Sequence, residues 1–160
     1  MKPRVYLETT ILSYLTALPS RDLVLAAHQQ VTRDWWDRRD RFELFVSDLV
    51  IREAGAGGEE AAARRLQAIK EASVLPLSTE ATALARALVN EGPLPAKAAV
   101  DALHIGIAVT NGMDYLLTWN YTHIANATMR SRIEAVCRSR GYEPPVICTP
   151  EELMEEEESV

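Results

Sequence analysis

Three acidic residues and one amide stand at positions from which they could act together: Glu8, Glu53, Asp101 and Asn120. Glu8 and Asn120 each follow the end of an apolar segment, and Glu53 comes six residues after another. Asp101 interrupts the long apolar stretch 98–109. Because a buried carboxylate is costly unless it is paired, hydrogen-bonded or bound to a metal, Asp101 in particular requires a partner.

The chemistry of such a set is that of a hard cation. Clustered carboxylates repel one another unless a cation neutralises them. Oxygen ligands without histidine or cysteine favour Mg²⁺ or Mn²⁺ over Zn²⁺. A water bound to such an ion is deprotonated more easily and can attack a phosphodiester. The residue types therefore predict hydrolase chemistry without a protein nucleophile.

Alternating strands and helices must position these residues. We expect strands over 4–7, 43–47, 74–77, 115–117 and 146–148. We expect helices over 11–17, 22–40, 49–54, 59–72, 78–90, 96–111 and 123–141, the last bent near Asn126, with Thr9 or Thr10 capping the first. This alternation predicts an α/β fold, a three-layer α/β/α sandwich with a five-stranded parallel sheet. In such sheets, ligands bind at the carboxyl ends of the strands.

Composition places few limits on the partner. The net charge is −6, but six of the 23 acidic residues lie in the last ten positions, which leaves 17 acidic and 17 basic residues elsewhere. The body is therefore neutral, and charge neither supports nor excludes nucleic acid. We expect one domain over 1–150 and an acidic tail over 151–160, which starts as a short helix. No segment is long and apolar enough for a membrane span. Cys137 and Cys148 are isolated and are expected to be reduced thiols in the core. We therefore expect a cytoplasmic protein.

Four segments together resemble the PIN-domain family, ribonucleases that include VapC-type toxins. They are VYLETTILSYL, VSDLVIREAG, AVDALHIGIA and YLLTWNYTHIAN, and the resemblance extends to about Pro150. It implies a PIN-like sandwich, a Mg²⁺- or Mn²⁺-dependent acidic site and cleavage of RNA. Carried over by position, the catalytic residues are Glu8, Glu53, Asp101 and Asn120. Glu8, Asp101 and Glu53 would hold the metal, Asn120 would orient a water, and Thr118 would position a water or phosphate.

Two positions depart from the family pattern. Glu8, in Glu8-Thr9-Thr10, stands where the family usually has Asp, and Asn120 where it often has Asp. Glu8 is one methylene longer than Asp, and Asn120 keeps an oxygen but has no charge. The site would then carry three negative charges, which suit one divalent ion better than two.

Structural interpretations compete with these assignments. Asp101 could pair with Lys97 one helical turn earlier, and Glu8 could act at a helix N-terminus. His104 is expected to be a core or interface histidine and not a base. Trp119 is expected to pack beneath its loop.

The leading hypothesis is a metal-dependent endoribonuclease, the toxin of a type II toxin–antitoxin pair. The resemblance also implies an antitoxin protein partner and a homodimer. The first alternative is a catalytically weak or inactive PIN-fold module that binds RNA or a protein. The second is a hydrolase of DNA or small phosphodiesters that uses the same carboxylates.

Overall fold

A central parallel sheet organises the computed structural model, which describes residues 1–154. Within these residues its five strands are β1 (Arg4–Leu7), β2 (Glu43–Ser47), β3 (Ser73–Leu75), β4 (Tyr115–Leu117) and β5 (Val146–Cys148). They lie in the order β3-β2-β1-β4-β5, and every neighbouring pair is parallel. The predicted five-stranded parallel sheet is confirmed. At the centre of the sheet, residues 5–7 of β1 are apolar and fully buried, as expected for a strand with helices on both of its faces.

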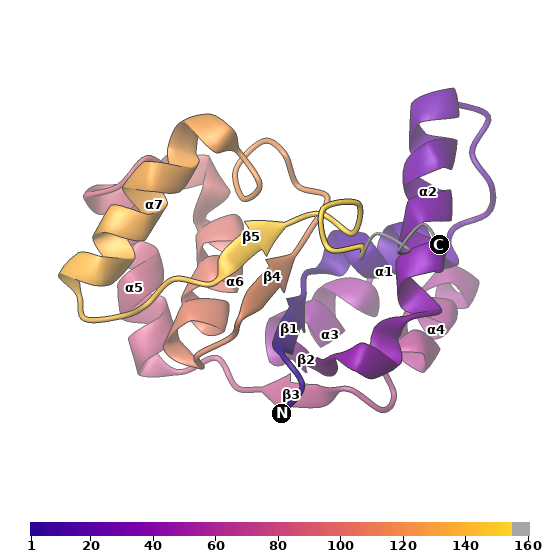
Figure 1. Cartoon of the computed structure of the whole chain (residues 1–160), viewed down its shortest axis with the longest axis horizontal. Helices are drawn as coiled ribbons and strands as arrows, with labels where there is room; N and C mark the ends of the chain where they lie inside the picture. The colour runs from indigo at the N-terminus through magenta and orange to yellow at the C-terminus, as the bar shows by residue number, and fades with distance from the viewer. Residues whose placement is uncertain (155–160) are drawn as a thin grey trace, which may run out of the picture.

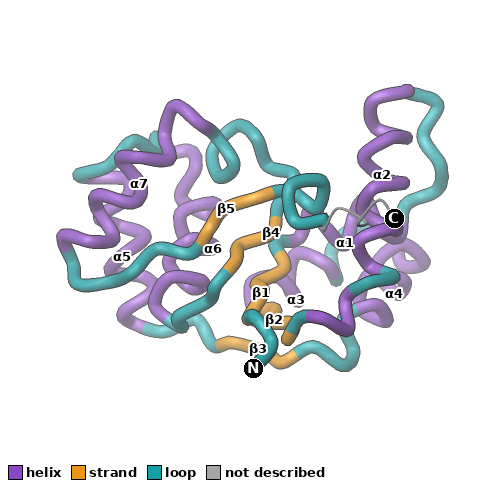
Figure 2. Tube along the Cα trace, in the orientation of Figure 1, coloured by secondary structure: helices purple, strands orange, loops and turns teal. Residues whose placement is uncertain are grey.

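Helices cover the sheet on both sides, so the predicted three-layer sandwich is confirmed. They are α1 (Thr9–Thr16), α2 (Leu23–Trp36), α3 (Asp48–Ala54), α4 (Glu59–Ala68), α5 (Thr79–Asn90), α6 (Ala99–Thr110) and α7 (Ala127–Ser139), with 3-10 turns at Arg39–Arg41 and Ala96–Ala98. Helices α5, α6 and α7 gather on one side, and α1, α2 and α4 on the other (Figure 1). The short strands lie between these two groups (Figure 2). Helix α3 follows β2 and contacts α1 and α4.

Several helix boundaries differ from prediction. Helix α7 begins at Ala127, not at position 123, because the side chain of Asn126 caps it by accepting a hydrogen bond from the Thr128 N–H at 2.9 Å. Helix α2 ends at Trp36 and α4 at Ala68, both earlier than expected. The apolar stretch 98–109 is buried continuously only from residue 104, and Val100 is 47% exposed. The first turn of α6 therefore reaches the surface.

The C-terminal segment is described only in part. Residues 151–153 form a turn, and Leu153 and Met154 pack against the core. The rest of the predicted tail helix lies outside the described residues.

Cys137 and Cys148 are free and buried, as expected. Across residues 1–154, none of the helices combines the length and apolar character that crossing a bilayer requires.

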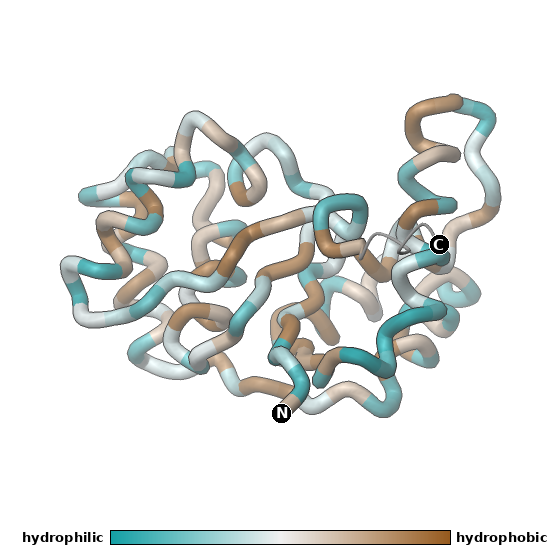
Figure 3. Tube along the Cα trace, viewed as in Figure 1, coloured by the Kyte–Doolittle hydropathy of each residue, from teal (hydrophilic) through white to brown (hydrophobic). Residues whose placement is uncertain are grey.

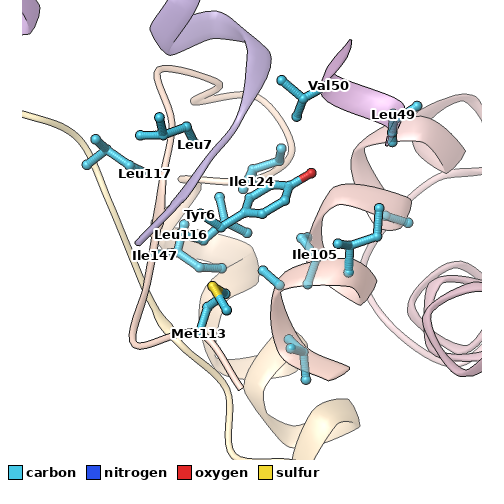
Figure 4. Packing of buried hydrophobic residues seen from close by; sticks show 14 of the residues in the cluster. Tyr6, Leu7, Leu49, Val50, Ile105, Met113, Leu116, Leu117, Ile124 and Ile147 are labelled. Carbon is cyan, nitrogen blue, oxygen red and sulfur yellow. The ribbon is translucent and has the colours of Figure 1, made fainter. Parts of the chain in front are cut away.

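The core lies around β1 and β4. Figure 4 shows the Tyr6 ring among apolar side chains that include Leu116, Ile105 and Ile124. Figure 3 shows the apolar strands at the centre and another apolar segment at the outer end of α2. In that outer segment, Leu23 and Val24 are 86% and 64% exposed. This second segment is surface, not core.

Candidate active site

The pairing of β1 with β4 places the first two site residues side by side. Leu7 pairs with Leu117, so Glu8 and Thr118 follow at the same edge of the sheet. The Glu8 N–H donates to the Leu117 carbonyl at 3.1 Å, which extends the ladder by one residue. The hydroxyl of Thr118 then donates to Oε1 of Glu8 at 2.6 Å. Both residues are buried, at 4% and 0% exposure.

Glu8 also begins helix α1. Its Oε2 accepts the Thr10 N–H at 3.1 Å, and its Oε1 accepts the Thr10 hydroxyl at 2.5 Å. The prediction that Thr9 or Thr10 caps this helix was therefore wrong. Glu8 is the N-cap, because its side chain accepts hydrogen bonds from Thr10 in the first turn. Negative charge at a helix N-terminus is favourable. The structural and functional interpretations of Glu8 are thus compatible, since one carboxylate caps the helix and faces the sheet edge.

Glu53 lies in the last turn of α3 and is joined to the first residue of α1, Thr9, which follows Glu8. Its Oε1 accepts the Thr9 hydroxyl at 2.8 Å and lies 2.6 Å from Nε2 of His104. Burial, the largest effect, raises the pKa of Glu53, but the hydrogen bonds from His104 and Thr9 act in the opposite direction, and the pKa is lowered overall. The carboxylate is therefore ionised at neutral pH.

Asp101 lies in the first turn of α6, and its side chain is 23% exposed. Its Oδ1 accepts from Nδ2 of Asn120 at 3.0 Å, and its Oδ2 lies 2.9 Å from Nδ1 of His123. In the part of the chain that the structure describes, these two residues, and not Lys97, are its partners. The pairing of Asp101 with Lys97, one of the alternatives from the sequence, is therefore not formed.

The orientation of the Asn120 amide follows from its contacts. Its Oδ1 accepts the backbone N–H of His123 at 3.1 Å, so Nδ2 is the atom that faces Asp101. A flipped amide would lose both hydrogen bonds. The backbone N–H of Asn120 donates to the Thr118 hydroxyl at 2.9 Å, and this hydroxyl donates to Glu8. Asn120 therefore orients Asp101, and the Thr118 hydroxyl connects Glu8 to the Asn120 loop.

A chain of contacts thus joins the predicted site residues along one edge. Glu53 reaches Thr9 beside Glu8, and Glu8 reaches Asp101 through Thr118 and Asn120. The atoms that could bind a metal ion are the oxygens of the three carboxylates, which suit Mg²⁺ or Mn²⁺ in chemical type, because Asn120 presents its NH₂ group and not its oxygen to Asp101. Among residues 1–154, however, no three His, Cys, Asp or Glu side chains are grouped closely enough to hold an ion. An ion shared by all three carboxylates therefore requires some of these side chains to move.

Sequence reasoning missed the two histidines that pair with the acids. His104 lies three residues after Asp101 on α6 but contacts Glu53, and His123 lies three residues after Asn120 but contacts Asp101. Their short separation from Asp101 and Asn120 in the sequence was the available signal, but only the tertiary contacts identify their partners. Trp119 was interpreted correctly. It is 4% exposed, and its Nε1 donates to the Thr32 hydroxyl at 2.8 Å.

Comparisons with known proteins add to this geometry. No family model and no curated protein sequence matches the chain. Among solved structures, it is similar to VapBC2 from Rickettsia felis bound to a promoter DNA fragment, with a TM-score of 0.58 and 15% identity over 91% of this chain and 98% of that one. It is also similar to VapC20 of Mycobacterium tuberculosis, a toxin that cleaves the sarcin–ricin loop. That match has a TM-score of 0.52 and 14% identity over 86% of this chain and 95% of that one. The chain therefore has the PIN-like fold of VapC toxins.

Proposed function

We propose that the chain is a Mg²⁺- or Mn²⁺-dependent endoribonuclease that hydrolyses RNA phosphodiester bonds, and that it is the toxin of a type II toxin–antitoxin pair. The observation that carries the proposal is the linked set of carboxylates at the carboxyl edge of the sheet. Glu8, Glu53 and Asp101 come from three separate segments and are joined through Thr9, Thr118 and Asn120. The activity named for the Mycobacterium tuberculosis neighbour, cleavage of the sarcin–ricin loop, belongs to the same class.

In this proposal, Glu8 and Asp101 hold the metal and Glu53 binds it directly or through a water. When bound, the metal supplies an activated water and offsets charge in the transition state. Asn120 holds Asp101 in place through its amide, and Thr118 fixes Glu8 through its hydroxyl. The lowered pKa of Glu53 keeps that side chain ionised, as a ligand or an acceptor of a water proton must be. We retain the hypothesis of a single metal ion, since Asn120 adds no charge.

We also propose an antitoxin protein partner and a homodimer. The segment before α2 and its first turn project from the body (Figure 1). Leu18, Leu23 and Val24 in this region are 78%, 86% and 64% exposed. Apolar side chains gathered on a projecting element are typical of protein contact surfaces. This surface supports a protein partner without identifying it.

One observation favours the alternative, a PIN-fold module with weak or no catalysis that binds RNA or a protein. Each carboxylate already accepts hydrogen bonds from its own chain: Glu8 from Thr10 and Thr118, Glu53 from Thr9 and His104, Asp101 from Asn120 and His123. At Glu8 and Asp101 both carboxylate oxygens accept such bonds, so these bonds compete with a metal ion for the same oxygens, whereas Glu53, among the described residues, accepts at Oε1 alone. If these hydrogen bonds are too strong for a metal ion to displace, the protein folds but does not catalyse the reaction.

A substrate panel separates these possibilities. Wild-type protein with Mn²⁺ is incubated with an end-labelled single-stranded RNA, the DNA of the same sequence and a small phosphodiester reporter. We expect internal cuts in the RNA at a rate at least about 10-fold above the DNA, a difference of about 1.4 kcal/mol in activation free energy. Equal or faster cleavage of the DNA or the reporter would contradict a ribonuclease and favour a hydrolase of DNA or small phosphodiesters. Binding of RNA without cleavage of any substrate would favour the inactive module.

A further inference from the structure

A buried series of hydrogen bonds leads from the start of α3 to the carboxylate of Glu53. The Val50 N–H donates to Oγ of Ser47 at 3.2 Å, and this Oγ lies 2.8 Å from the Tyr6 hydroxyl. The same hydroxyl lies 2.8 Å from Nδ1 of His104, whose Nε2 lies 2.6 Å from Oε1 of Glu53. Ser47 and Tyr6 are 0% exposed and His104 is 1% exposed. The interior of this series is therefore closed to bulk solvent.

The direction of each hydrogen bond follows from the groups that make it. An ionised carboxylate only accepts, so the proton between His104 and Glu53 belongs to Nε2. A second proton, on Nδ1, would make this nitrogen a donor to the Tyr6 oxygen, the phenol would then donate to Ser47, and the Ser47 hydroxyl proton would have no acceptor within the series. With the proton on Nε2 alone, Nδ1 accepts a hydrogen bond from the Tyr6 hydroxyl. Burial, the largest effect on Tyr6, raises its pKa, so the phenol keeps that proton. The Tyr6 oxygen accepts from the Ser47 hydroxyl, and Ser47 accepts from Val50. Every donor in the series then has one acceptor.

The series is built into the elements that carry the site. Ser47 is the last residue of β2 and the N-cap of α3, and Glu53 lies in the last turn of that helix. Tyr6 comes from β1 and His104 from α6. Figure 4 shows Tyr6 within the core with its hydroxyl on the side of α3. Four elements therefore fix the orientation of one imidazole.

That imidazole in turn fixes one oxygen of Glu53. Within residues 1–154, this carboxylate accepts hydrogen bonds from Thr9 and from His104, and both reach Oε1. Two donors on one oxygen limit rotation of the carboxylate and leave Oε2 for a metal ion or water. A side chain that orients a metal-binding group in this way is typically worth 10- to 100-fold in affinity or activity, an estimate of about 1.4 to 2.7 kcal/mol.

We propose that His104 is a positioning residue for Glu53: the Tyr6 hydroxyl holds it as the Nε2–H tautomer, and in this form it orients the carboxylate for the RNA-cleaving reaction. The catalytic part of this inference rests on the proposed function, and the tautomer does not. The competing explanation is that His104 only fills and stabilises the core. That explanation requires no particular tautomer and no donor to Glu53.

The tautomer is measured by long-range proton–nitrogen NMR on protein with ¹⁵N-labelled histidine. The His104 signals are assigned by their loss in His104→Gln. We expect wild-type His104 to show a protonated Nε2 and an unprotonated, hydrogen-bonded Nδ1. In Tyr6→Phe, which keeps the ring and removes the hydroxyl, the Nδ1 signal should shift as its donor is lost. A wild-type spectrum with the proton on Nδ1 would overturn the proposal.

The positioning role is tested with His104→Gln and His104→Asn. The glutamine amide reaches the place of Nε2 and can donate to Glu53, whereas the shorter asparagine amide reaches only the place of Nδ1. We expect kcat for RNA cleavage to be about 10-fold higher in the Gln variant than in the Asn variant, with similar KM. Both are assayed below their unfolding temperatures. Equal kcat values in the two variants would contradict a positioning role.

The NMR measurement and the comparison of the two variants test separate claims. If the wild-type protein cleaves no RNA, the proposed function is lost, and the NMR spectrum still decides whether the hydroxyl of Tyr6 selects the tautomer. Mn²⁺ affinity of the two variants, measured by calorimetry, then replaces kcat, and weaker binding by the Asn variant is the expected result. If RNA is cleaved and Gln does not exceed Asn, the function stands and the assignment of His104 is wrong.

Discussion

Replacing Asp101 with Asn is expected to lower the rate of RNA cleavage by about 10²- to 10⁴-fold, since a charged metal ligand contributes several kcal/mol to the transition state. Asparagine keeps the shape of the side chain and removes its charge. Asp101 has only 23% of its side chain exposed and accepts from Asn120 and His123 at the edge of the sheet. The rate is measured on the labelled RNA in Mn²⁺.

The matched control is Asp34→Asn, the same chemical change at an exposed position on α2. Asp34 accepts a hydrogen bond from Gln30 on the protein surface, so its loss should leave cleavage within about 2-fold of the wild type and stability within about 0.5 kcal/mol. Thermal unfolding of both variants shows whether the fold is kept. Wild-type activity in folded Asp101→Asn would remove Asp101 from the catalytic set.

The largest effect on stability is expected from Gly106→Ala. Helices α5 and α6 approach so closely at this position that an added Cβ would lie 2.4 Å from the Ala81 carbonyl oxygen and 3.5 Å from the Ala81 Cα. Both atoms belong to the backbone, so relief requires the helices to separate. Overpacking of a core costs about 1 to 3 kcal/mol and occasionally more, while alanine is favoured over glycine in a helix by about 1 kcal/mol. Because the contact is with backbone, we expect the upper end of this cost, about 3 kcal/mol, and therefore a net loss of about 2 kcal/mol in the free energy of unfolding.

Urea unfolding measures this loss, and Gly58→Ala provides the comparison. An added Cβ at Gly58 would meet nothing within 4 Å, and its φ of −59° is open to alanine. The change there should stay within about 0.5 kcal/mol, as at other open surface positions. If Gly106→Ala were as stable as Gly58→Ala, the helices would not be packed as closely as the structure has them.

The sheet and the first site residue could be predicted because strand ends are visible in the sequence. Apolar β-branched and aromatic residues define β1. The first polar residue after them, Glu8, could therefore be placed at the carboxyl end of this strand. The same argument placed Thr118 and Asn120 after β4. Alternation with helices then predicted the layers. These inferences needed only local patterns and the geometry of parallel sheets.

The missing parts depend on contacts between distant segments. The pairing of Glu53 with His104 joins α3 to α6, and no local sequence pattern predicts this contact. Asp101 was expected to be buried and was considered with Lys97, but the first turn of α6 reaches the surface and the loop after β4 folds back with His123. The start of α7 was a missed local signal, since Asn126 is a good cap residue that was interpreted as a bend.

The histidine contacts change how the acidic site is understood. Two of its three carboxylates, Glu53 and Asp101, are each hydrogen-bonded to an imidazole, and the third, Glu8, caps a helix. A site of this kind is ordered before any ion arrives. Metal binding must then exchange some of the hydrogen bonds at Glu8 and Asp101 for coordination, whereas Oε2 of Glu53 accepts none of the bonds described above. We therefore expect Mn²⁺ to bind more weakly than at a site where Glu8 and Asp101 are free.

Removal and return of the metal test the central claim most directly. Wild-type protein is stripped with EDTA, dialysed and incubated with the labelled RNA, first without metal and then with Mn²⁺ added in steps. We expect no cleavage by the stripped protein and recovery that saturates as Mn²⁺ rises. Undiminished cleavage without metal, or no cleavage at saturating Mn²⁺, would contradict a metal-dependent ribonuclease built on Glu8, Glu53 and Asp101.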